Sequence, residues 1–120
     1  MDIKHNKMVS ALVKPGQAII DSLTPEDADL LHMAVGVSGE AGELLDAVKK
    51  KVIYRKELDI DNMKEELGDI EFYMERIRQI CGFTREEVIE ANISKLSKRY
   101  KSLSYSDDAA QKRADKAEGE

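Results

Sequence analysis

The chain has 120 residues, a net charge of −5 and a sequence pI near 5.1, and 36% of its residues are charged. This length suits one domain with a small core, and the acidic balance without a concentrated basic face argues against a duplex nucleic acid as partner. No apolar run approaches the ~20 residues of a membrane span, no signal-peptide core is evident and only one cysteine is present, so we expect a cytoplasmic protein that does not contact a membrane.

The N-terminal segment predicts a weak amphipathic helix. Residues 3–14 carry Ile3, Met8 and Leu12 among polar spacers, and Pro15 with Gly16 then interrupts or bends the chain. A short apolar turn over residues 18–20 follows. The absence of Trp and the low content of Pro and Gly favour an all-α protein.

The clearest helix start in the chain is at Thr24. Thr24 has the character of an N-cap, Pro25 suits the first helical position and Asp27 follows three residues after the cap. A long helix is predicted from residue 25 to about residue 52. Glycines recur within it at 36, 39 and 42, and each costs about 1 kcal/mol relative to alanine. Such a helix needs a neighbour or a ligand at close range, and both reasons stay open.

Two further helices are predicted after a connection over residues 54–60. The first is capped by Asp59 or Asp61 and runs to about residue 80, where Gly82 suits a left-handed stop and Cys81 is expected to be a small core residue. The second begins at a capping box formed by Thr84 and Glu87 and reaches about residue 100.

The segment after residue 103 changes character, because residues 106–120 contain no apolar side chain larger than alanine. We therefore expect one domain over residues 1–104, with a motif core at 25–100, and a polar, flexible tail at 105–120 unless a partner subunit holds it. The predicted architecture is an all-α bundle of four or five helices. Helices 25–52 and 60–80 pair antiparallel in it, and helix 84–100 closes the site between them.

Two acidic pairs stand inside the apolar patterns of the two long helices. Glu40 and Glu43 are three residues apart, as are Glu66 and Asp69, so each pair shares one face of its helix. Core-type residues flank both pairs: Met33, Val37, Leu44 and Val48 on the first helix, and Met63, Leu67, Ile70 and Met74 on the second. Carboxylates gathered near a core raise one another's pKa or bind cations, and oxygen ligands suit Mg²⁺ or Mn²⁺.

A solvated helix face and an iron site are the alternatives to a magnesium site at these acidic pairs. A single acidic pair with this spacing is usually a solvated helix face. A di-iron carboxylate bundle requires Glu-x-x-His on two helices, and neither His5 nor His32 has a glutamate three residues before it. The residues therefore favour an all-oxygen Mg²⁺ site over an iron site.

Three motifs occur in order along the chain: residues 39–46 (GEAGELLD), residues 65–70 (EELGDI) and residues 92–100 (NISKLSKRY). Together they resemble the motifs of the MazG-like all-α nucleoside triphosphate pyrophosphohydrolases. The family pattern is Glu-x-x-Glu, a spacer, Glu-x-x-Asp and a later helix with Asn and Lys, and here 22 residues separate Glu43 from Glu66. The resemblance covers residues 28–100.

The resemblance implies a Mg²⁺-dependent enzyme, with Mn²⁺ as an alternative ion, that cleaves a nucleoside triphosphate, ribo or deoxy, between the α and β phosphates. Its products would be the monophosphate and pyrophosphate, and its role nucleotide pool control or house-cleaning. Metal and catalytic functions would fall on Glu40, Glu43, Glu66 and Asp69. Bound Mg²⁺ neutralises the triphosphate and lowers the pKa of a coordinated water. Which carboxylate accepts the water's proton stays open, because Gly39 stands where some relatives have a further acid.

The resemblance also implies a substrate-binding set and an assembly. Asn92, Lys95 and Arg99 match the third motif and would face the phosphates or sugar, while Tyr73 and His32 would contact the sugar or base. The plain alternative for the three residues of the third motif is a solvated basic face. For Tyr73 it is an ordinary core aromatic, and for His32 an ordinary interfacial histidine. The family forms homodimers or homotetramers with sites near the subunit interface. The competing hypothesis is a non-catalytic helical binding or regulatory module that keeps the fold.

Overall fold

The computed structural model describes residues 4–103, 105 and 107–112 of the chain. These residues form helices and no strand, so the predicted all-α class is confirmed. The helices are α1 (His5–Leu12), α2 (Gly16–Ser22), α3 (Pro25–Val52), α4 (Ile60–Cys81), α5 (Arg85–Arg99) and α6 (Asp107–Lys112). No helix in this described part has the length and apolar character needed to cross a bilayer.

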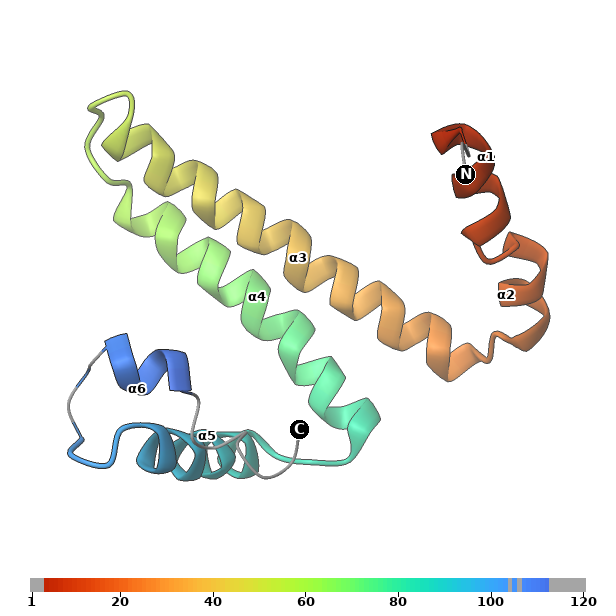
Figure 1. Cartoon of the computed structure of the whole chain (residues 1–120). Coiled ribbons are helices and arrows are strands. Elements are labelled where there is room, and N and C mark those ends of the chain that lie inside the picture. Colours follow the sequence, from red (N-terminus) through yellow and green to blue (C-terminus); the bar gives the residue numbers. More distant parts are fainter. Residues whose placement is uncertain (1–3, 104, 106, 113–120) are drawn as a thin grey trace.

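The centre of the fold is an antiparallel hairpin of the two long helices α3 and α4, which lie side by side along most of their length (Figure 1). Met33 and Ala47 of α3 are buried. Most of the other predicted core positions, Val37, Leu44, Met63, Ile70 and Met74, are only half-buried. Val48 and Leu67 are 36% and 50% exposed. The helix pairing is as predicted, but the core of a single chain is thinner than the apolar stripes suggested.

The helix ends follow local capping rules. Thr24 Oγ1 accepts a hydrogen bond from the Asp27 N–H at 3.0 Å, and the Asp27 carboxylate accepts one from the Thr24 N–H at 3.2 Å. Asp59, rather than Asp61, caps α4 by accepting from the Asn62 N–H at 3.0 Å. Gly82 ends α4 with a φ of 80°, a conformation that costs glycine little.

The helices α1 and α2 extend away from the N-terminal end of α3 (Figure 1). The segment expected as an apolar turn is the helix α2, with Pro15 at its N-cap. Neither short helix buries a residue. Their exposed apolar side chains and those of the adjoining loops are Met8, Val9, Leu12, Val13, Ile19, Ile20 and Leu23.

The position of α5 differs from the expectation. This helix turns away from α4 after Gly82 and packs with α6, and it makes no extensive contact with α3 or α4 among the described residues (Figure 1). It therefore does not close the hairpin within one chain. The prediction that Cys81 is a core residue is wrong, because it is exposed. Cys81 is the last residue of α4, and the departing α5 leaves it uncovered.

The chain is expanded for its length. Its radius of gyration is 20.1 Å, whereas a compact domain of this size has about 14 Å. Its accessible surface is 10009 Å², whereas a compact monomer of 13.5 kDa exposes about 6,500 Å². A large apolar surface therefore remains available on a single chain.

Candidate metal centre

Three carboxylates from the two long helices meet at one place. Glu40 projects from α3, and Glu66 and Asp69 project from α4, with one carboxylate oxygen of each within 4.8 Å of the others. Glu40 and Glu66 are half-buried and Asp69 is exposed. The structure thus brings together three of the four acids that the motifs indicated.

The fourth acid, Glu43, lies outside this group. It is exposed on α3, one turn beyond Glu40. Its negative charge nevertheless raises the pKa of Glu66. Asp46, another turn along, pairs instead with Lys50 at 3.4 Å.

The Glu66 carboxyl has a pKa raised above the ordinary range of glutamate. The largest cause is a side-chain hydrogen bond with Glu40, followed by burial and by the negative charges of Glu40, Glu43 and Asp69. Two carboxylates that approach each other this closely favour sharing a proton, because both cannot stay charged without a compensating cation.

The residues of this group fit a hard divalent cation. The Glu66 Oε2 atom is buried and has no hydrogen-bond partner. A polar atom in that position loses its hydration without gaining a replacement, which a cation or an ordered water would correct. All donors in the group are carboxylate oxygens, the ligand type that Mg²⁺ and Mn²⁺ prefer.

The Tyr73 ring packs in the interface between the two long helices. A Cβ atom built at Gly36 would lie 2.3 Å from Tyr73 Cδ1, so the ring occupies the space that a side chain at position 36 would take. Phe72 meets the Tyr73 ring edge to face at 5.3 Å. Tight packing therefore explains Gly36. A Cβ at Gly39 or Gly42 would meet nothing within 4 Å, so packing within this chain explains neither of them.

The other predicted substrate residues lie apart from the carboxylates. His32 is exposed on α3. Asn92, Lys95 and Arg99 stand on α5, where Asn92 is exposed and the other two are half-buried. Because α5 leaves the hairpin, a single chain does not bring this helix to the carboxylate group.

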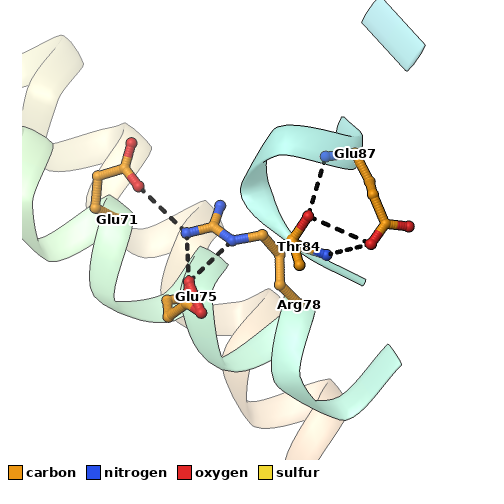
Figure 2. Close-up of polar contacts among 5 residues, drawn as sticks. All are labelled: Glu71, Glu75, Arg78, Thr84 and Glu87. Carbon is orange, nitrogen blue, oxygen red and sulfur yellow. Dashed lines mark hydrogen bonds and ion pairs between the residues drawn. The ribbon is translucent and has the colours of Figure 1, made fainter. Parts of the chain in front are cut away.

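Sequence reasoning missed Arg78, a buried charged residue of α4. Its guanidinium donates to Glu75 Oε2 at 2.9 and 3.1 Å and lies 3.6 Å from Glu71 (Figure 2). The signal was the presence of glutamates three and seven residues earlier on the same helix. Arg78 also borders a groove of about 630 Å³ whose lining includes Asp29, Met33, Phe72 and Arg76.

Comparison with known proteins identifies the family. The family model for the MazG nucleotide pyrophosphohydrolase domain matches residues 21–104, which include α3, α4 and α5. No curated protein and no solved structure matched the chain. The match spans more than half of the chain and contains all the acidic and α5 residues discussed above. The chain belongs to the MazG nucleotide pyrophosphohydrolase family.

Proposed function

We propose that the protein is a Mg²⁺-dependent nucleoside triphosphate pyrophosphohydrolase that cleaves between the α and β phosphates. The products are a nucleoside or deoxynucleoside monophosphate and pyrophosphate, and the role is nucleotide pool control or house-cleaning in the cytoplasm. The observation that carries the proposal is the convergence of Glu40, Glu66 and Asp69 with an unpartnered oxygen of Glu66. Membership of the family supports the reaction class.

The carboxylate group has two tasks in this proposal. Glu40, Glu66 and Asp69 hold the cation, and Glu43 adds negative charge from one turn away. When bound, Mg²⁺ offsets the charge of the triphosphate and promotes attack by water. One carboxylate of the group accepts the proton that the attacking water releases. Mn²⁺ suits the same oxygen ligands.

Substrate contacts are assigned to residues outside the carboxylate group. Asn92, Lys95 and Arg99 bind the phosphates or sugar, and Tyr73 and His32 contact the sugar or base. Because α5 points away from the hairpin of its own chain, its residues can serve as substrate contacts in a site that forms near a subunit interface.

We infer that the working form is a homodimer or homotetramer. The accessible surface of one chain exceeds that of a compact monomer of this mass by roughly 3,500 Å², so ample surface is left for contacts between subunits. The exposed apolar residues of α5, Val88, Ile89, Ile93 and Leu96, add to the surface available for this purpose. Assembly buries apolar area that one chain leaves open.

The test of the function is ion chromatography of the products from a panel of ribo- and deoxynucleoside triphosphates, with and without Mg²⁺. We expect pyrophosphate and the matching monophosphate, only with the metal. Release of orthophosphate alone contradicts the proposed bond of attack. Glu66→Gln should abolish turnover, and Glu65→Gln, an exposed neighbour on the same helix, should leave it intact.

A further inference from the structure

The contact between Gly36 and Tyr73 lies one helical turn from the carboxylate group. Gly36 is four residues before Glu40 on α3, and Tyr73 is four residues after Asp69 on α4. Because the helices are antiparallel, moving one turn forward along α3 and one turn back along α4 leads from the Gly36–Tyr73 contact to the carboxylate group. The packing contact and the carboxylate contact are therefore neighbours in the same register.

We propose that Gly36 and Tyr73 are positioning residues that set the separation of α3 and α4 at which Glu40 can share a cation with Glu66 and Asp69. The inference rests on the proposed metal site. It assigns to Gly36 a role in metal affinity rather than in helix stability, because glycine weakens a helix interior and only the absence of a Cβ explains its use here.

The geometry leaves little room for any side chain at position 36. The built Cβ lies 2.3, 2.4 and 2.6 Å from Tyr73 Cδ1, Cε1 and Cγ, whereas ordinary contact begins at 3.4 Å. The near end of the ring is among these atoms, so rotating the ring about its own axis does not relieve the overlap. Alanine at this position therefore requires the ring to leave the interface or the helices to separate.

Separation acts directly on the carboxylate group. Its oxygens lie within 4.8 Å of one another, and the group combines one residue of α3 with two of α4. Oxygen ligands must lie about 2.0–2.1 Å from Mg²⁺ in near-octahedral geometry, so a shift of the order of 1 Å between the helices removes Glu40 from reach. The residues of α4 keep their mutual spacing, which predicts weakened rather than abolished binding.

The chain offers matched control positions. Gly39 on α3 and Gly68 on α4 adjoin Glu40 and Asp69, yet a Cβ at either position would meet nothing within 4 Å. Each Gly→Ala change improves helix propensity by the same amount. The three variants thus differ in the contact with Tyr73 and share the local backbone effect.

The experiment measures Mn²⁺ binding by the full chain, through electron paramagnetic resonance of free ion and through thermal shift, without nucleotide. We expect Gly36→Ala to weaken apparent affinity at least tenfold, while Gly39→Ala and Gly68→Ala stay within about twofold of the original chain. Tyr73→Ala removes all three crowding atoms, so adding Gly36→Ala to it should cost less than about twofold.

Each outcome has a defined meaning. Unchanged Mn²⁺ affinity in Gly36→Ala overturns the positioning role, and so does an equal loss in the presence and absence of the Tyr73 ring. If Gly36→Ala does not fold, Tyr73→Ala decides the question: a positioning role of the ring predicts weaker Mn²⁺ binding than in the original chain, and unchanged binding overturns it. Failure of the original chain to bind Mn²⁺ counts against the proposed function itself, which distinguishes the two failures.

Discussion

Arg76 of α4 donates a hydrogen bond to Asp29 of α3, with 2.6 Å between Nη2 and Oδ2. The pair joins the start of one long helix to the last turns of the other, two turns from the Gly36–Tyr73 contact on the α3 side. Its side chains are 48% and 32% exposed, so solvent screens the interaction. An ion pair this exposed contributes little to the stability of the fold.

Loss of this ion pair should have a small effect. We expect Arg76→Met, which keeps most of the apolar stem, to lower the free energy of unfolding by no more than about 1 kcal/mol. The difference should shrink in high salt, because salt screens exposed charges. Urea denaturation at low and high salt measures it, and Arg85→Met on α5 is a matched control. A much larger loss would show that Arg76 acts through packing.

The metal response should depend on Glu66. In the presence of Mg²⁺ we expect the original chain to melt at a higher temperature than in EDTA, since a cation that binds only the folded chain stabilises it. Glu66→Gln should melt at or above the temperature of the metal-free original, because it removes a repulsive charge, and should gain nothing from Mg²⁺. Glu65→Gln should keep the full response.

The stability of the metal-free protein should fall with rising pH across the range set by Glu66. Its pKa is raised in the folded chain, so the folded state keeps a proton that the unfolded state releases. The loss of folding stability that comes from ionising Glu66 is absent below the ordinary glutamate pKa and complete above the raised pKa. Urea titrations in EDTA should show this slope flattened in Glu66→Gln, and identical slopes would contradict a shifted Glu66.

The caps of α3 and α5 allow a paired test of helix starts. Thr84 Oγ1 accepts from the Glu87 N–H at 3.1 Å, and the Glu87 carboxylate accepts from the Thr84 N–H at 3.3 Å (Figure 2). Thr84→Ala and Thr24→Ala should each cost about 1 kcal/mol of unfolding free energy, whereas Thr→Ser should cost little. Equal stability of the alanine and serine variants would show that these boxes do not stabilise the helices.

The assembly should appear in the concentration dependence of melting. Because folding and association are coupled when one chain buries little, the melting temperature should rise with protein concentration. Sedimentation equilibrium should give a mass of two or four chains. Ile93→Glu, at an exposed apolar position of α5, should lower that mass. A monomeric original chain whose melting temperature does not change with concentration would contradict the inferred oligomer.

The features that sequence reasoning predicted correctly are governed by nearby residues. The boxes at Thr24 and Thr84 and the left-handed Gly82 depend on partners within a few positions, so their patterns are readable without the fold. The expected convergence of four acids on the two long helices is met by Glu40, Glu66 and Asp69, whereas Glu43 lies outside the group.

The features that it missed depend on contacts between distant parts of the chain. The capping box and apolar pattern of α5 predict a helix but not its direction, and the observed direction, away from the α3–α4 hairpin, leaves Cys81 exposed. The reason for Gly36 required knowing that Tyr73 lies opposite it, whereas Gly39 and Gly42 show the same sequence spacing without any such neighbour. Periodicity alone does not separate these cases.

The exposed thiol of Cys81 has a practical consequence. It is the single cysteine of the chain and stands where α4 ends and α5 begins, so a maleimide fluorophore or spin label attaches at one defined corner without prior engineering. Labelling rates in dilute and concentrated protein then report whether neighbouring subunits shield that corner.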